Sequence, residues 1–312
     1  MFAGTVYLNG MLRNLKKMES IYLTMMHEVW FMACHMKNIK KNIKKRQLKS
    51  NLKNLMKNEK KNNISLSDED LLRYNKHILL DEIGIDGIEL LNTKHIAIIG
   101  LGGIGCPLAQ YLSTSGIGTI TLIDSDIIEE TNLQRQVLYT GLDIGKYKVD
   151  IASTKIKKMN PKLNVFTSKL RFCKDTSKII RNVDMVIDAT DNFSTRTAIN
   201  AATIKYKKPL IMGAAIEMQG QISVFRNDHK DMPCYNCLYS DIEDQATSCM
   251  NQGVLSSLTG AVGSILATEA IKVLLSMSET LESKLLLIDF KNMIFRNIKI
   301  VKDKKCCVCN EL

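Results

Sequence analysis

The sequence lacks a clear segment that could cross a membrane. The strongest candidate, residues 21–36, has 16 residues and carries His27 and Glu28 near its middle. A membrane-spanning helix needs about 20 predominantly apolar residues. Glu28 also interrupts the apolar core that a secretory signal peptide requires, and no clear cleavage site of small residues follows. We therefore expect no membrane span.

Acidic residues are scarce at the start of the chain. Residues 1–64 hold 14 Lys and Arg but only 3 Asp and Glu, which accounts for the whole net charge of +11. The segment 37–64 is rich in Lys and Asn and has too few apolar residues to form a core. We predict that residues 1–66 form a basic extension, which is either disordered or a targeting segment. Such an extension is either simply solvated or binds RNA or anionic lipid.

Excess charge is absent from the rest of the chain. Residues 65–312 hold 29 residues of each sign, so this part lacks the basic surface typical of a nucleic-acid-binding domain. We predict one folded domain over residues 67–312. Ser67, followed three residues later by Asp70 and then by an apolar-periodic run, predicts a capping box that opens its first helix.

Nine cysteines occur without a convincing secretory signal, which favours a reducing compartment where thiols bind metal or do chemistry. Cys234 and Cys237 form one Cys-x-x-Cys pair, and Cys306 and Cys309 form another. Four thiolates at this spacing predict a closed, tetrahedral zinc site, with a redox dithiol as the alternative. We expect a cytoplasmic protein, or one that the basic extension directs to an organelle.

Apolar runs alternate with segments of helical spacing, and this alternation predicts a mostly parallel, doubly wound sheet. After residue 215 the apolar runs indicate antiparallel strands around one apolar helix. We find no internal repeat and predict a Rossmann-like α/β fold whose parallel sheet is continued by antiparallel strands. The expected strands cover 94–100, 119–126, 164–170, 183–192, 219–226, 284–290 and 295–300, and the expected helices cover 106–116, 146–160, 195–206 and 260–275.

A glycine-rich loop lies between the first expected strand and its helix. Gly100 allows a tight turn, Gly102 lets the backbone approach a phosphate, and Gly105 lets helix and strand pack closely. The helix N-terminus then favours an anion. Asp124 lies at the end of the next apolar run, where its carboxylate can accept both ribose hydroxyls. These residues predict an adenine nucleotide without deciding between NAD and ATP, and a purely structural turn is the alternative.

Three charged residues discriminate between the two nucleotides. Arg135 and Lys148 would neutralise charge on the phosphates, and Asp191, at the end of another expected strand, would hold Mg²⁺. A hydride-transfer enzyme needs few such cations and no metal-binding acid there. Their combined placement therefore favours phosphoryl or nucleotidyl transfer from ATP over an NAD-dependent oxidoreductase.

Several motifs together resemble the MoeB/ThiF/HesA family, from about residue 70 to residue 310. These proteins are adenylyltransferases that activate small ubiquitin-like sulfur carriers, and they are relatives of ubiquitin-activating enzymes. The motifs are RYNKHILL, GLGGIGCPLAQYL, LIDSD, NLQRQVLY, DATDN, GAAIEMQGQISVF and PCYNCL.

The resemblance implies a role for each matching residue. Arg73 would cross a dimer interface into the partner's ATP site, which implies a homodimer. Asp191 would be the magnesium ligand, and Cys306 would be preferred to Cys307 at the zinc site. The residues that the resemblance places around ATP are Gly100, Gly102, Gly103, Gly105, Asp124, Asp126, Asn132, Arg135, Lys148, Asp191 and Asn192.

The remaining cysteines have different expected roles. Cys249 matches a cysteine on a mobile crossover loop, which in some family members forms a thioester or persulfide and in others is dispensable. We therefore keep both a covalent role and a bystander thiol open for Cys249. Cys106 and Cys173 are expected to be small core residues.

The family's reaction implies that a carrier's C-terminal glycine is adenylated by ATP, giving an acyl-adenylate and pyrophosphate. A sulfur donor then displaces AMP to leave a thiocarboxylate. The sequence ends soon after Cys309, and we expect this donor to be a separate protein. The alternatives are a tRNA threonylcarbamoyladenosine cyclodehydratase, an activating enzyme for a ubiquitin-like protein modifier, and a non-catalytic scaffold.

Overall fold

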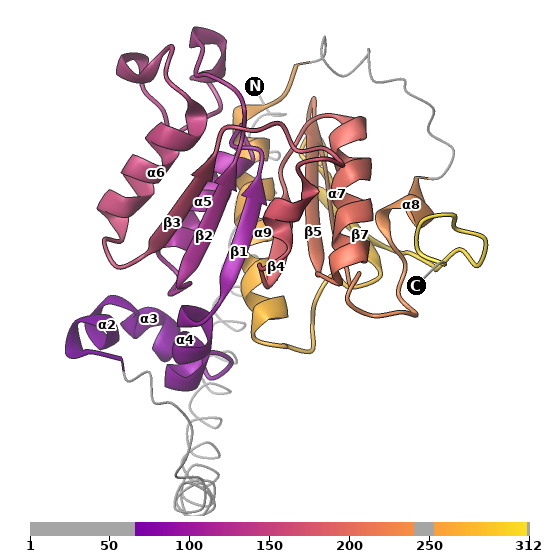
Figure 1. Ribbon diagram of the computed structural model, residues 1–312, viewed down its shortest axis with the longest axis horizontal. Helices are drawn as coiled ribbons and strands as arrows, with labels where there is room; N and C mark the ends of the chain where they lie inside the picture. Colours follow the sequence, from indigo (N-terminus) through magenta and orange to yellow (C-terminus); the bar gives the residue numbers. More distant parts are fainter. Residues whose placement is uncertain (1–65, 240–252, 311–312) are drawn as a thin grey trace, which may run out of the picture. The chain divides into compact units, whose positions relative to one another are not determined.

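Figure 1 shows the computed structural model, which describes residues 66–239 and 253–310. Within these ranges the strands form one sheet in the order β3-β2-β1-β4-β5-β6-β7-β8. The first five strands in this order run parallel, and each later strand is antiparallel to its neighbour. The predicted Rossmann-like fold with an antiparallel continuation is confirmed. The strands are β1 (His95–Ile99), β2 (Thr119–Ile123), β3 (Asn164–Ser168), β4 (Met185–Asp188), β5 (Leu210–Ile216), β6 (Gln219–Phe225), β7 (Lys284–Asp289) and β8 (Ile294–Lys299).

Helices cover both faces of the sheet (Figure 1). Because side chains alternate along a strand, Ile96 and Ile98 of β1 pack on the side of α4, α5, α6 and α9, whereas Ala97 and Ile99 pack on the side of α7. The α-helices are α2 (Asp68–Arg73), α3 (Asn75–Ile78), α4 (Gly84–Asn92), α5 (Gly105–Ser113), α6 (Lys148–Met159), α7 (Phe193–Tyr206), α8 (Tyr235–Leu238) and α9 (Ser256–Leu274), and the 3-10 helices are η1 (Glu130–Asn132), η2 (Gly141–Asp143) and η3 (Ser177–Ile180).

Helix α9 belongs to the core of the sheet. It is the one helix of the described ranges that is long and apolar enough to cross a membrane. A Cβ added at Gly213 of β5 would lie 2.7 Å from Leu266, and one added at Gly220 of β6 would lie 2.9 Å from Val262. The helix is therefore packed directly on the two strands, and it does not indicate a membrane span.

The strand order places three loops at one edge of the sheet. Strand β1 pairs with β2 on one side and β4 on the other, so the chain reverses its direction of winding at β1. Ile99 is in register with Ile123 and Asp188. The loops that follow β1, β2 and β4 therefore leave the sheet at the same level, at the carboxyl edge where open α/β sheets bind ligands.

The segment before β1 differs in part from the prediction. The capping box is confirmed, because the Ser67 hydroxyl accepts the Asp70 N–H and the Asp70 carboxylate accepts the Ser67 N–H. The helix is interrupted at Tyr74, whose buried hydroxyl accepts a hydrogen bond from Asn160. The division of the chain at residues 66 and 67 stays a prediction, since residues 1–65 lie outside the described ranges.

Candidate functional site

The glycine loop after β1 is tightly folded on one side and open on the other. Gly100 has φ +90°, and a Cβ there would lie 2.8 Å from the Ala189 carbonyl oxygen. A Cβ at Gly105 would lie 2.0 Å from the carbonyl oxygen of Gly100. A Cβ at Gly102 would meet one atom of the part of the chain that the structure describes, the Gln136 amide nitrogen at 3.8 Å. The turn thus requires glycine at positions 100 and 105, whereas the Gly102 face leaves space for a ligand.

Asp124 connects the end of β2 to this loop. Its Oδ2 accepts the Leu101 N–H at 2.6 Å and its Oδ1 accepts the Asp126 N–H at 2.8 Å. Burial raises the pKa of the Asp124 carboxyl, and the nearby Lys148 ammonium opposes that rise. Each carboxylate oxygen keeps a further acceptor position. The pair of oxygens is therefore suited to two neighbouring hydroxyl groups.

Lys148, the first residue of α6, brings a cation to the same place. Its side chain is almost fully buried, and Nζ lies 2.9 Å from Asp126 Oδ2. The Tyr139 hydroxyl lies 3.1 Å from the Leu101 carbonyl oxygen and 3.4 Å from that of Lys148. Tyr139 thus links the glycine loop to the start of α6. Sequence reasoning gave Tyr139 no role, although it ends the motif NLQRQVLY.

A cavity of about 370 Å³ lies beside Asp124. Asn132, at the end of η1, is buried and accepts the Glu129 N–H at 3.2 Å through its Oδ1. Arg135 follows on the next turn, where one guanidinium nitrogen donates to the Thr131 carbonyl at 3.0 Å. The other guanidinium donors of Arg135 make no hydrogen bond or ion pair with any residue in the described ranges. The cavity is lined by Ser125, Asp126, Ile127, Glu129, Asn132, Tyr147 and Lys148.

Asp191 follows β4 at the same edge. Its side chain is exposed, and its carboxylate makes no hydrogen bond or ion pair with any residue that the structure describes. The neighbouring Asn192 caps α7, because its Oδ1 accepts the Thr195 N–H at 2.9 Å. Asp191 therefore offers an uncommitted carboxylate to a cation, whereas the oxygen of Asn192 is already used by the helix.

Arg73 lies away from these residues within one chain. It ends α2, and its guanidinium donates to the Met159 carbonyl at 3.0 Å. Met159 ends α6 and Lys148 begins it, so the two ends are about 16 Å apart at 1.5 Å per residue. The structure thus connects Leu101, Asp124, Asp126 and Lys148 directly, but it does not bring Arg73 to them.

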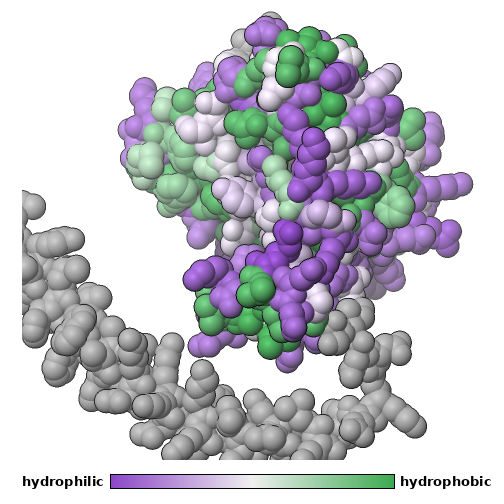
Figure 2. All heavy atoms as spheres, turned by 90° about the vertical axis from the view of Figure 1, so that its left-hand side faces the viewer, coloured by the Kyte–Doolittle hydropathy of each residue, from purple (hydrophilic) through white to green (hydrophobic). Residues whose placement is uncertain are grey.

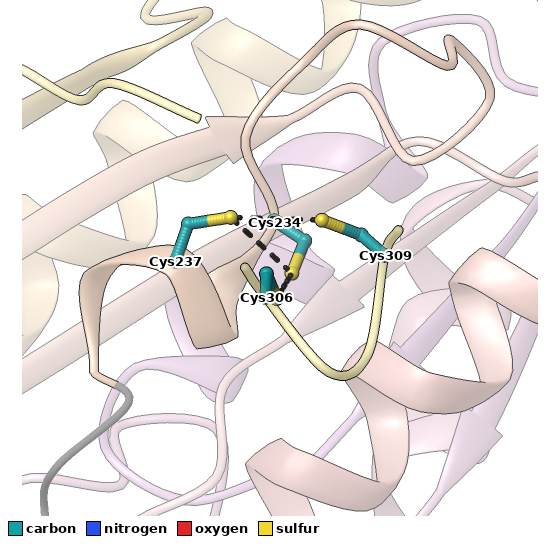
Figure 3. A group of neighbouring side chains, drawn as sticks. All are labelled: Cys234, Cys237, Cys306 and Cys309. Carbon is teal, nitrogen blue, oxygen red and sulfur yellow. Dashed lines mark hydrogen bonds between the residues drawn. The ribbon is translucent and has the colours of Figure 1, made fainter. Parts of the chain in front are cut away.

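A second group of side chains lies beyond β6 and β8. Figure 3 shows Cys234, Cys237, Cys306 and Cys309 converging, and their sulfur atoms all lie within 4.8 Å of one another. Cys234 is 3.8 Å from Cys306 and 3.9 Å from Cys237, and Cys237 is 3.6 Å from Cys309. Zn–S bonds of 2.3 Å in a tetrahedron place sulfurs about 3.8 Å apart. The four thiols therefore fit a zinc ion.

The other cysteines divide between buried and exposed positions. Cys307 is exposed and is not one of the four converging thiols. Cys106 is buried as predicted, but the expectation that Cys173 is a core residue is wrong. Cys173 lies in the loop between β3 and η3, where its backbone N–H donates to the Thr176 hydroxyl at 2.9 Å, and its side chain is exposed although the neighbouring Phe172 is buried. Cys249 lies outside the described residues, and its two alternatives stay open.

A family model and the similar proteins of known name indicate the same family. A family model described as the ThiF family matches residues 74–309. The chain is 37% identical over 247 residues to the molybdopterin-synthase adenylyltransferase of Escherichia coli, covering 79% of this chain and 99% of that protein. It is 36% identical over 249 residues to the sulfur carrier protein adenylyltransferase of Thermus thermophilus, covering 78% and 92%.

Longer relatives are matched over part of their length. The chain is 38% identical over 246 residues to the adenylyltransferase and sulfurtransferase MOCS3 of Culex quinquefasciatus, covering 78% of this chain but 56% of that protein. The chain thus spans about half the length of the MOCS3 proteins it matches. Among solved structures, E. coli MccB with ATP has a TM-score of 0.66 at 24% identity and covers 81% of this chain and 75% of that one. This similarity shows the fold alone.

Proposed function

The chain belongs to the ThiF family, and from this membership we propose that it uses ATP to adenylate the C-terminal glycine of a ubiquitin-like sulfur-carrier protein. The observation that carries the proposal is the hydrogen-bonded set of Leu101, Asp124, Asp126 and Lys148 at the carboxyl edge of the sheet. Relatives named as adenylyltransferases of molybdopterin synthase and of sulfur carriers support the substrate class.

The proposed nucleotide position follows from the donors and acceptors at this edge. Asp124 binds the ribose through the acceptor positions that Leu101 and Asp126 leave open. The phosphates lie along the open face at Gly102, where backbone N–H groups and the N-terminus of α5 favour an anion. Lys148 and Arg135 then balance the charge of the phosphate chain.

Asp191 is proposed to hold Mg²⁺, because its carboxylate is exposed and has no hydrogen-bond or ion-pair partner among the described residues. Mg²⁺ is usually bound by one or two carboxylates together with substrate phosphates. When bound, the ion would supply charge stabilisation at the departing pyrophosphate. The site fits this ion because the Asp191 carboxylate is a hard oxygen donor beside the glycine loop, where the phosphates are proposed to lie.

The reaction needs little proton transfer. The carrier's terminal carboxylate is already ionised and attacks the α-phosphorus, the bond to the bridging oxygen breaks, and pyrophosphate leaves. The products are an acyl-adenylate and pyrophosphate. Lys148 and Arg135 stabilise the charge that develops on the leaving group, so positioning and charge neutralisation account for the catalysis. A separate sulfur donor would then displace AMP.

The direct test is carrier-dependent exchange of labelled pyrophosphate into ATP. The Asp191→Ala variant should lose the exchange, because the metal and the pyrophosphate are no longer held together. Asp86→Ala is the matched control, since Asp86 is an exposed carboxylate on α4 at the opposite edge of the sheet and should leave the rate unchanged. Exchange that persists in Asp191→Ala would remove the metal assignment.

We propose that the enzyme is a homodimer in which Arg73 completes the partner's site. Within one chain Arg73 lies at the far end of α6 from Lys148, so it can act at an ATP site only if that site belongs to the partner. Arg73→Ala and Asp191→Ala should each be inactive. Mixing the two variants should restore about a quarter of the wild-type rate, since half of the dimers are mixed and each mixed dimer has one intact site. No recovery after verified subunit exchange would contradict this arrangement.

The four converging cysteines are proposed to hold a structural zinc ion, since all four tetrahedral positions are filled by thiols. Metal analysis of the purified chain tests this proposal.

We also propose that the enzyme works in the cytoplasm, which suits a chain with nine cysteines and metal-binding thiol pairs. Cell fractionation tests this location.

A further inference from the structure

A buried asparagine on α7 contacts the thiol cluster. Asn200 is 1% exposed, and its Nδ2 lies 3.6 Å from the sulfur of Cys234. Its Oδ1 accepts the Tyr235 backbone N–H at 3.2 Å and the Asn227 amide at 3.2 Å. A backbone N–H can only donate, so the oxygen of Asn200 must face Tyr235. The amide NH₂ group therefore faces the sulfur.

The neighbours of Asn200 prevent this amide from turning. Asn227 donates to Asn200 and also to the Thr203 hydroxyl, at 2.8 Å. The Thr203 hydroxyl lies 2.9 Å from the carbonyl oxygens of Ile199 and Asn200. Asn227 and Thr203 are themselves at least nine-tenths buried. The Asn200 side chain is thus held in one orientation by groups that lie away from the four thiols.

Cys234 is the thiol that most needs such a donor. It is 1% exposed, the least of the four, so water cannot solvate its sulfur. A buried anion without a hydrogen-bond donor is strongly unfavourable. Residues that hydrogen-bond metal ligands orient them and tune their charge, and replacing one typically reduces metal affinity by about 10- to 100-fold.

We propose that Asn200 is a positioning residue of the zinc site, which donates an N–H to the Cys234 thiolate and ties the first Cys-x-x-Cys pair to α7. This inference rests on the zinc site proposed above. Asn236 donates similarly to Cys306, at 3.6 Å, but it is partly exposed, and its amide makes no hydrogen bond to α7 among the described residues. Asn200 is therefore the donor that connects the cluster to the core of the sheet.

The test replaces the donor while keeping the shape. In Asn200→Asp an oxygen takes the place of the NH₂ group. The side chain can still accept the Tyr235 N–H, but the oxygen that now faces the Cys234 thiolate has lone pairs where the N–H donor was and repels it. The full chain is loaded with Co²⁺, and the thiolate-to-cobalt absorption is recorded. Zinc affinity is then measured by competition with a chelator. We expect affinity to fall about 10- to 100-fold and the cobalt absorption to change in energy.

Asn160→Asp is the matched control. Asn160 is also 1% exposed and donates to the Tyr74 hydroxyl and the Ser113 carbonyl, far from any described cysteine pair. This variant should lose thermal stability without a change in zinc affinity or cobalt absorption. If Asn200→Asp behaves in the same way, Asn200 is only a packing residue and the inference is overturned. If the wild-type chain binds neither metal, the proposed zinc site itself fails.

Discussion

Replacing Gly102 with alanine should separate nucleotide binding from folding. Among the described residues the new Cβ would meet only the Gln136 amide nitrogen, at 3.8 Å, which is ordinary van der Waals contact. The backbone there does not have the positive φ that disfavours alanine. A compatible Gly→Ala change stabilises a fold by about 0.4–1 kcal/mol through the unfolded chain. The free energy of unfolding of Gly102→Ala should therefore be unchanged or slightly higher.

The same methyl group should obstruct the phosphates. If a phosphate oxygen accepts the backbone N–H at this face, losing that hydrogen bond to a charged group removes about 1.5–3 kcal/mol. The dissociation constant for ATP should rise about 10- to 100-fold. Calorimetric titration with ATP and Mg²⁺, together with urea unfolding, measures both quantities on one preparation.

Two further glycines serve as controls. Gly260→Ala adds a methyl group on α9 that meets no described atom outside the backbone of its own helix within 4 Å, so stability should not fall and ATP affinity should not change. Gly105→Ala would place its Cβ 2.0 Å from the Gly100 carbonyl oxygen, and the fold should lose about 1–3 kcal/mol or more. Wild-type ATP affinity in Gly102→Ala would refute the reasoning, because the phosphates would then lie elsewhere.

Two other predictions concern cysteines. Cys306→Ser should lose the one bound zinc ion per chain and unfold at a lower temperature, whereas Cys307→Ser should keep the zinc ion and the wild-type unfolding temperature. Metal analysis and thermal denaturation measure these two properties. Zinc loss in Cys307→Ser alone would reverse the assignment. Hydrogen bonds from Thr176 lower the pKa of the Cys173 thiol, while burial raises that of Cys106 to about 12. More thiolate is therefore present at Cys173 near pH 7.5, and mass spectrometry should find it alkylated by iodoacetamide while Cys106 stays unmodified; equal labelling in the folded chain would contradict this.

Strands of the fold could be predicted because the residues next to them in the sequence mark where they end. Strands β1 and β2 are short apolar runs followed directly by Gly100 and Asp124, and β4 is a short run that ends three residues before Asp191. Each of these junctions begins a loop of the site. Asp124 and Asp191 were therefore assigned to the correct edge from sequence. The surface of the described residues, by contrast, mixes hydrophilic and hydrophobic side chains on the face shown in Figure 2, and no local pattern distinguishes its exposed residues.

The rest depended on contacts between distant residues. Tyr139 reaches Leu101 across 38 positions, and Asn200 reaches Cys234 across 34. Neither contact leaves a periodic signal in the chain. Tyr74 interrupts a helix that its neighbours favour, because its side chain is buried and its hydroxyl accepts a hydrogen bond from Asn160. At Tyr74 tertiary packing thus overrides local helix propensity.

The two cysteine pairs flank the last strands of the sheet, and this order has a consequence during synthesis. Cys234 and Cys237 precede α9, β7 and β8, whereas Cys306 and Cys309 come after β8. A nascent chain that has emerged from the ribosome as far as β7 contains only two of these four cysteines. The four can meet only once β7 and β8 have been synthesised, so the thiol cluster closes after the antiparallel end of the sheet has emerged from the ribosome.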